Sequence, residues 1–190
     1  FQNPFESLNP RFTIYRALLE PLLIHNIGTK QQRDQLVAEI LERVNLRPAS
    51  AFLSKYPHQM SGGQLQRVVL ARALVVNPTF LVADEPVSML DVSVRAGVLN
   101  LMKDVAESME LTTVYISHDL SLLQYLCQRT AVMYLGQIVE LGPTEQLLAD
   151  PQHPYTQGLV AAIPRLRRDG SDPEPVALGS SIPSPIDLPP

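Results

Sequence analysis

Apolar residues recur at helical spacing through the first part of the chain. Residues at i, i+4 and i+8 form an apolar stripe in Arg11–Ile24, where Pro21 is expected to kink or end the helix. Lys30–Leu46 carries a similar stripe opposite a charged face, and a third helix is predicted for Ser61–Val76. The first third of the protein is therefore predicted to be helical.

The hydrophobic period then changes. Thr79–Ala83 and Thr112–Ile116 are short apolar runs bounded by turn formers, which is typical of strands, and the first run suits a strand covered on both faces. Between them, Asp91 can cap a helix that reaches Met109. Strand, helix, strand in this order predicts a right-handed crossover between parallel strands, and hence an α/β fold with helices flanking a parallel sheet.

The remaining pattern predicts shorter elements and a tail. Two apolar runs that flank Gly136 predict a hairpin at the edge of the sheet, and the composition turns to Pro, Ser and Gly after Arg168, which predicts an extended tail. The predicted elements are a helix at Leu120–Cys127, strands at Thr130–Leu135 and Gln137–Leu141, and helices at Pro143–Ala149 and Pro154–Ile163 with proline in the first position.

Composition narrows the class of protein. Of 190 residues, 45% are hydrophobic and 18% charged, which is enough apolar material for a core. Fifteen Lys and Arg against nineteen Asp and Glu give a net charge of −4, which disfavours a nucleic-acid binder. The single cysteine and the absence of a visible signal peptide fit a reducing cytosol, and no apolar run approaches the ~20 residues that a transmembrane helix needs.

Ser61-Gly62-Gly63-Gln64 lies at the head of a predicted helix. A helix start presents unpaired N–H groups and a partial positive charge, and glycines let a ligand approach the backbone, so the segment suits an anion such as phosphate. A capped turn with no ligand is the structural alternative.

Polar side chains follow both predicted strands. Asp84 and Glu85 come directly after the first strand, where α/β proteins bind ligands, so Asp84 can hold Mg²⁺ and Glu85 can orient or deprotonate a water. His118 follows the second strand and is expected at the same edge, where it could hydrogen-bond a phosphate. Ordinary turn and cap residues, including Asp91 as a helix cap, are the alternative interpretation.

Taken in order, these segments resemble the C-terminal part of an ABC-transporter ATP-binding subunit, a P-loop NTPase-like domain with a helical subdomain. Five motifs carry the resemblance: Met60–Gln64 is similar to the signature motif, Phe80–Asp84 with Glu85 to the Walker B strand and catalytic glutamate, Ser88–Asp91 to the D-loop, His118 to the switch histidine, and Gln2 to the Q-loop glutamine.

The resemblance implies ATP and Mg²⁺ as ligands and assigns roles residue by residue. Glu85 and His118 would be catalytic, Asp84 and Gln2 would serve the metal, and the nucleotide would be bound by Gln2, Ser61, Gly62, Gly63, Gln64 and Asp91. It also implies residues 1–60 as Q-loop and helical subdomain, 61–150 as the α/β core, and 151–190 as a C-terminal extension.

One family motif is missing. The chain holds no Gly-x-x-x-x-Gly-Lys-Ser/Thr phosphate loop, so we expect a fragment that begins after that loop and does not hydrolyse ATP alone.

The far end resembles a subgroup. Asp150–Gln157 and the following Ala162-Ile163-Pro164 are similar to the C-terminal extension of oligopeptide and dipeptide importers. This implies a head-to-tail dimer with a second ATP-binding subunit, transmembrane permease partners, an indirect link to a solute-binding protein, and a peripheral location on the cytoplasmic face of a bacterial inner membrane. A soluble ABC ATPase of DNA repair or translation, or a truncated non-hydrolysing partner-binding module, are the alternatives.

Overall fold

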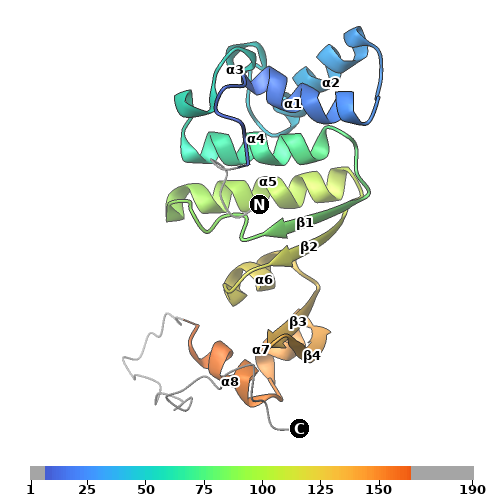
Figure 1. The fold of residues 1–190 in the computed structure, drawn as a ribbon. Coiled ribbons are helices and arrows are strands. Elements are labelled where there is room, and N and C mark those ends of the chain that lie inside the picture. The colour runs from blue at the N-terminus through green and yellow to red at the C-terminus, as the bar shows by residue number, and fades with distance from the viewer. Residues whose placement is uncertain (1–6, 164–190) are drawn as a thin grey trace. The chain divides into compact units, whose positions relative to one another are not determined.

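The computed structural model describes residues 7–163 and divides the chain into two compact units, Phe1–Ile116 and Ser117–Pro190 (Figure 1). None of the helices between residues 7 and 163 combines the length and the apolar character that crossing a bilayer requires. Gln2, predicted to be the Q-loop glutamine, and the predicted tail after Arg168 lie outside the described residues.

The first unit contains the predicted helices and both strands of the crossover, with their ends shifted by a few residues. Its short helix α3 and 3₁₀ turn η1, between the second and third predicted helices, were not predicted. The elements are α1 (Ile14–Ile24), α2 (Lys30–Arg43), α3 (Ser50–Leu53), η1 (Pro57–Gln59), α4 (Gly62–Leu74), β1 (Phe80–Asp84), α5 (Val92–Ser108) and β2 (Thr112–Ile116).

Local chemistry explains where the first helices begin and end. The hydroxyls of Thr13 and Thr29 accept hydrogen bonds from backbone N–H groups of the first turns of α1 and α2. Pro21 does not end α1, because the helix continues to Ile24. The second helix stops short of the predicted Leu46, since Asn45 adopts a left-handed backbone with φ of 59°.

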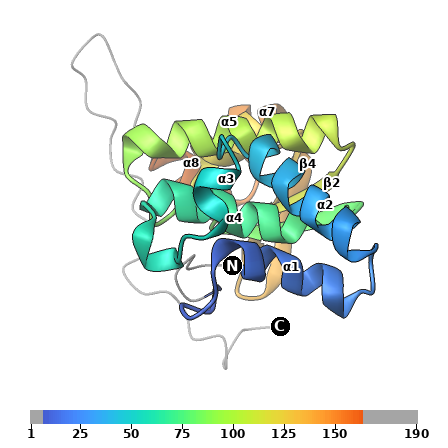
Figure 2. The same cartoon turned by 90° about the horizontal axis from the view of Figure 1, so that it is seen from above.

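The core of this unit surrounds α4, which lies between α1 and α5 (Figures 1 and 2). The predicted apolar stripe of α1 is fully buried, and the side chains of α4 are buried on more than one face, as expected for a helix with neighbours on both sides. The fully buried residues of α1 and α4 are Ile14, Leu18, Leu22, Leu65, Val68, Ala71 and Leu74.

The crossover places β1 and β2 in parallel register, as predicted, with Val82 beside Val114 and Asp84 beside Ile116. The expectation that β1 is covered on both faces is wrong for the described residues. Val82 and Val114 are 47% and 43% exposed, because helices of this unit cover one face of the strand pair only.

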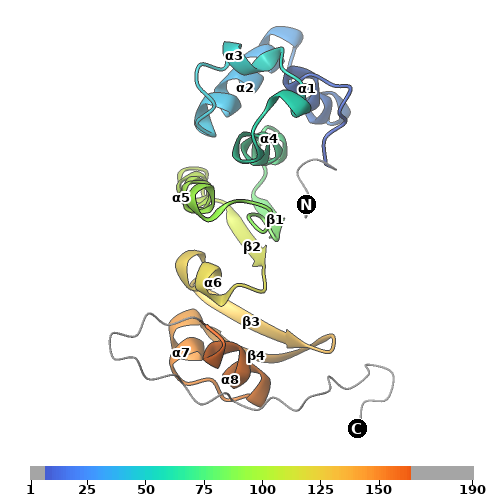
Figure 3. The ribbon, with the colours of Figure 1, turned by 90° about the vertical axis from the view of Figure 1, so that its left-hand side faces the viewer.

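The second unit consists of α6 (Leu120–Leu126), β3 (Arg129–Tyr134), β4 (Gln137–Pro143), α7 (Thr144–Ala149) and α8 (Pro154–Ala161). The predicted hairpin around Gly136 is confirmed, with β3 and β4 antiparallel and α7 packed against them (Figure 3). Among the described residues it forms a sheet of its own, so its predicted place at the edge of the parallel sheet is wrong. Pro143 ends β4 and caps α7 rather than opening the helix, whereas Pro154 does occupy the first position of α8.

The start of α8 is fixed by its own sequence and by β4. His153 caps the helix, its Nδ1 accepting a hydrogen bond of 3.1 Å from the Tyr155 N–H. The ring of Tyr155 packs on Tyr134 of β3, with ring centroids 4.5 Å apart. The His-Pro-Tyr sequence therefore specifies both the first turn of α8 and its contact with the hairpin.

Glu140 of β4 holds the segment that leads into α8. Its two carboxylate oxygens accept hydrogen bonds from the N–H groups of Gln152, at 3.0 Å, and His153, at 3.2 Å. Burial alone would raise the pKa of Glu140, but these hydrogen bonds, the nearby Thr156 hydroxyl and the imidazole of His153 outweigh it and lower the pKa. The ionised carboxylate therefore stabilises this junction.

Replacing Glu140 with glutamine should speed amide hydrogen exchange in α8 at pH 7, because the neutral amide accepts weaker hydrogen bonds. Since the folded pKa is lowered, the contribution is fully present above the ordinary value of 4.5 and is lost as pH falls through the folded pKa. Wild type and E140Q should converge at low pH. The exposed Glu145→Gln is the matched control, and equal effects of both substitutions would contradict this role.

Candidate nucleotide site

The predicted anion site at the head of α4 is an N-capped helix start. The Oγ of Ser61 accepts a hydrogen bond from the Gln64 N–H at 3.4 Å, and the Oε1 of Gln64 accepts one from the Ser61 N–H at 3.1 Å. The alternative interpretation, a capped turn, is thus correct as far as local structure goes. It does not exclude a ligand, because accepting a hydrogen bond leaves the exposed Ser61 hydroxyl able to donate one outward.

Two backbone donors remain at this helix start. Within residues 7–163, the N–H groups of Gly62 and Gly63 have no hydrogen-bond partner. They are the first two N–H groups of a 13-residue helix, where the helix dipole favours negative charge. This arrangement can accept an anion without any rearrangement of the backbone.

The two glycines differ in their surroundings. A Cβ on Gly62 would lie 3.7 Å from the Leu90 side chain, an ordinary contact, whereas a Cβ on Gly63 would lie 2.5 Å from Cγ1 of Val94. Gly63 is therefore required by the close approach of α4 to the first turn of α5. The same contacts bring the start of α4 against the Ser88–Asp91 segment.

The two predicted carboxylates leave the backbone in different conformations. Asp84 is the last residue of β1 and lies on the same face as the exposed Val82, while Glu85 has a left-handed backbone with φ of 47°. The Glu85 N–H donates to the Ile116 carbonyl at 2.9 Å, and its own carbonyl accepts from the Ser88 Oγ at 3.1 Å. Both side chains are half-buried, and the backbone turns between the two adjacent acids.

A left-handed glutamate is uncommon and costs conformational energy, which the surrounding hydrogen bonds must offset. No sequence pattern signals it: Glu85 precedes Pro86, which ordinarily favours an extended backbone. Sequence reasoning also missed the packing role of Gly63, since a glycine that makes room for a helix and one that admits a phosphate look alike.

Asp91 stands at the N-cap position of α5, as predicted, but its side chain makes no capping hydrogen bond. Its exposed carboxylate is thus outside the helix cap, contrary to the expected capping role. The backbone carbonyl of Asp91 still accepts from Val94 and Arg95 and so begins the helix.

Two predicted site residues lie outside the described part of this unit. His118 belongs to the second unit, two residues after the end of β2, and Gln2 lies outside the described residues. The first unit carries the Ser61–Gln64 helix start, Asp84, Glu85 and Asp91.

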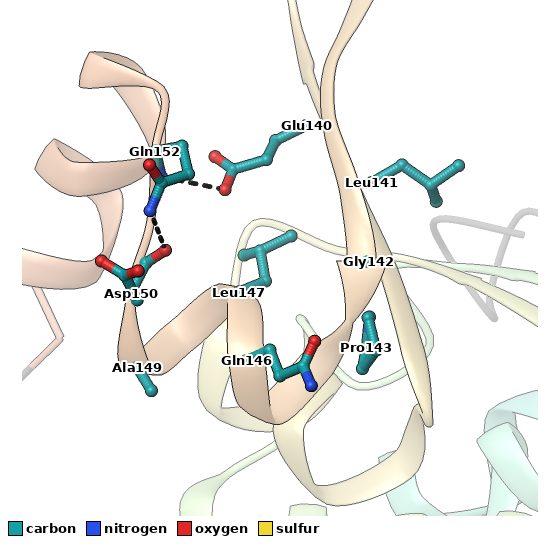
Figure 4. Close-up of a pocket in the computed structure, with 9 residues that line it drawn as sticks. All are labelled: Glu140, Leu141, Gly142, Pro143, Gln146, Leu147, Ala149, Asp150 and Gln152. Carbon is teal, nitrogen blue, oxygen red and sulfur yellow. Dashed lines mark hydrogen bonds between the residues drawn. The ribbon is translucent and has the colours of Figure 1, made fainter.

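The chain also forms a pocket of about 490 Å³ between β4 and α7, in the second unit (Figure 4). Glu140, Leu147 and Gln152 are among its lining residues, and none of the residues predicted to bind nucleotide lines it. The Glu140 carboxylate, which lines this pocket, already accepts hydrogen bonds from the segment that precedes α8. The pocket therefore lies where β4 is joined to that segment.

The carboxylate donors in the described residues suit a metal ion that is bound jointly by the protein and by a ligand. No group of three or more His, Cys, Asp or Glu side chains that could hold a metal ion occurs within residues 7–163. Asp84 offers a single half-buried carboxylate. Mg²⁺ is commonly bound by one or two carboxylates together with water and substrate phosphates, so this donor set suits Mg²⁺ and not a metal caged by protein alone.

Alanine at each of the two glycines should change the free energy of unfolding differently, through packing at Gly63 and through backbone flexibility at Gly62. Gly63→Ala should destabilise the intact protein by about 1–3 kcal/mol, because its methyl group overlaps Val94. Gly62→Ala should be neutral or stabilising by about 0.5 kcal/mol, since the chain loses less entropy on folding. Urea unfolding measures both, and a Gly63→Ala protein as stable as Gly62→Ala would contradict the contact.

Comparison with known proteins agrees with this geometry. Residues 1–88 match the family described as "ABC transporter", and residues 139–189 match "Oligopeptide/dipeptide transporter, C-terminal region". The chain is 47% identical, over 190 residues, to the oligopeptide transport ATP-binding protein AppF of Bacillus subtilis, and 48% identical, over 189 residues, to the dipeptide transport ATP-binding protein DppF of Haemophilus influenzae. All of this chain is covered in both alignments, but it spans only 57% of either relative.

Solved structures share the fold. A dimeric ATP-binding cassette in a post-hydrolysis state, bound to ADP and Pi, is 29% identical with a TM-score of 0.64, over 76% of this chain and 61% of that one. The cbiO1 subunit from Clostridium perfringens, at 24% identity and a TM-score of 0.70, supports the fold alone and covers 79% of this chain and 58% of that one. Along its whole length the chain is therefore similar to part of the ABC transporter ATP-binding proteins, in the group that carries the oligopeptide/dipeptide transporter C-terminal region.

Proposed function

We propose that the intact protein containing this chain binds and hydrolyses ATP and thereby powers the import of peptides or a related small solute. The relatives named as oligopeptide and dipeptide transport ATP-binding proteins support the solute class. The observation that carries the ATPase assignment is the acidic pair at the end of β1, with Asp84 in the strand and Glu85 in a left-handed turn.

The geometry of this pair favours two different roles. Asp84 ends a strand and offers its carboxylate at the carboxyl edge of the parallel sheet, where α/β proteins bind ligands. It would hold Mg²⁺, which would neutralise charge on the phosphates. Glu85, displaced from the strand direction by its turn, would orient the attacking water and accept its proton. His118 would donate a hydrogen bond near the γ-phosphate.

The helix start at Ser61 would act on the nucleotide of a second ATP-binding subunit. The Ser61 hydroxyl and the N–H groups of Gly62 and Gly63 are donors that do not need to move when negative charge develops on the phosphate. Gln64 would keep this helix start ordered, and Gln2 and Asp91 would complete the nucleotide and metal contacts.

The names of the relatives as transport ATP-binding proteins support the proposed partners. A second ATP-binding subunit would supply the opposing half of each site, and transmembrane permease subunits would receive the resulting motion. A solute-binding protein would act indirectly. The protein would therefore lie peripherally on the cytoplasmic face of a bacterial inner membrane.

The proposed division of labour can be tested in the intact protein. Glu85→Gln should retain Mg-ATP binding and lose turnover, because an amide cannot accept a proton from water. Asp84→Asn should weaken mainly the Mg²⁺-dependent part of binding. Nucleotide binding with and without Mg²⁺, together with phosphate release, distinguishes the two variants. Identical behaviour in both assays would show that the carboxylates do not divide the work.

Action of Ser61 in trans can be tested by mixing variants. Ser61→Arg should still bind ATP as a monomer but should fail to hydrolyse it, because the bulky side chain fills the space for the partner's γ-phosphate. In a heterodimer with Glu85→Gln, one composite site carries both lesions and the other carries neither, so ATPase activity should return.

Two controls make the mixing experiment decisive. Homodimers of each variant must be inactive, and formation of the heterodimer must be shown by differential tags. If the demonstrated heterodimer remains inactive, either Ser61 acts on its own subunit's nucleotide or the two sites cannot act independently. Weakened ATP binding by the isolated Ser61→Arg monomer would identify action in cis.

A further inference from the structure

Arg72 links the far end of α4 to two segments that precede it by more than fifty residues. Its Nη1 donates to the Ser7 carbonyl at 3.1 Å, across 65 residues of sequence, and its Nη2 donates to Oε2 of Glu20 at 2.7 Å, across 52 residues. Glu20 belongs to α1, and Ser7 precedes that helix. All three residues lie in the first unit.

Apolar packing already holds α1 against the core. Ile14, Leu18 and Leu22 are fully buried, so the position of this helix does not depend on Arg72 alone. The ion pair with Glu20 is also only partly buried, with side chains 28% and 39% exposed, which limits its contribution to stability. The contact with the Ser7 carbonyl is different, because it holds a backbone group outside any helix or strand.

The geometry of Arg72 is set by these two partners together. Its Nε is buried and has no hydrogen-bond partner among the described residues, an arrangement that costs free energy and needs a compensating gain. The planar guanidinium gains by presenting Nη1 and Nη2 to both partners at once. A lysine could pair with Glu20 but could not form the same fork.

The other end of the same helix is the predicted nucleotide contact. Ser61 caps α4, and Arg72 lies about 16 Å further along the helix axis. A straight helix transmits a displacement of one end to the other. Ser7 follows closely after Gln2 in the sequence, the residue that the proposed function assigns to the nucleotide and metal.

We propose that Arg72 is a positioning residue that makes the Ser7 segment follow α4 when the helix start binds nucleotide. This inference rests on the proposed ATP-binding function. The link is one hydrogen bond from a charged donor to one backbone carbonyl, so it should be possible to break it without unfolding α4.

The Leu8 amide reports the mobility of this segment, because the Leu8 N–H and the Ser7 carbonyl belong to one planar peptide unit. We would measure amide hydrogen exchange in the intact protein carrying Glu85→Gln, which retains ATP, with and without Mg-ATP. ATP should slow exchange at Gly62 and Gly63 and also at Leu8, there by up to about tenfold, because a helix held at its start restrains Arg72 and the Ser7 peptide unit bonded to it.

Adding Arg72→Lys should abolish the response at Leu8 and leave the response at Gly62 and Gly63 intact. Glu20→Gln is the matched control: it removes the ion pair but keeps the donor to Ser7, so both responses should persist. Arg72→Gln provides a second variant if Arg72→Lys does not fold, with circular dichroism and urea unfolding as the check.

The outcomes separate the two proposals. A Leu8 response that survives in a folded Arg72 variant overturns the positioning role, as does its loss in Glu20→Gln to the same extent as in Arg72→Lys. Absence of any ATP response at Gly62 and Gly63 in the parent Glu85→Gln protein overturns the proposed function instead.

Discussion

The close approach of α4 to the first turn of α5 is the constraint on which the first unit depends. At residue 63 the two helices leave no room for a side chain, because a Cβ would lie 2.5 Å from Val94. This contact fixes the capped start of α4 against the segment that leads from Glu85 into α5. The N–H donors at the start of α4 and the Asp91 carboxylate at the start of α5 are therefore held in fixed positions, although they belong to different helices.

At its other end, α4 is held by polar contacts in addition to the packing of Ala71 and Leu74. Arg72 reaches both Glu20 and the Ser7 carbonyl, while the buried stripe of α1 supports the helix between its ends. A helix that is fixed at both ends couples them, because a shift of one end strains the contacts of the other. The second unit also uses one side chain to fix two backbone groups, since the Glu140 carboxylate accepts hydrogen bonds from two N–H groups that precede α8.

Much of this architecture could be predicted from the sequence, because the local patterns and the tertiary contacts agree. The i, i+4 stripe of α1 and the apolar runs of β1 and β2 specify these elements and their parallel pairing. What could not be predicted depends on contacts between distant segments. The left-handed backbone at Glu85 is supported by the Ile116 carbonyl, and Gly63 is explained by Val94.

Motif order identified the candidate site, but not its local geometry. The Ser61–Gln64 cap was foreseen as one of two interpretations, and the structure shows that a cap and open donors coexist. Asp91 occupies the N-cap position without using its side chain there, a detail that helix-start statistics cannot supply. Roles for Gln2 and His118 remain predictions from motif resemblance.

The uncovered face of the β1–β2 pair has a consequence for handling the chain. Phe80, Val82, Val114 and Ile116 present aromatic and β-branched side chains to solvent on one side of a two-stranded sheet whose outer edges are unpaired among the described residues. Such a surface is a template for pairing between molecules. Expressed alone, residues 1–190 should therefore tend to self-associate through this face.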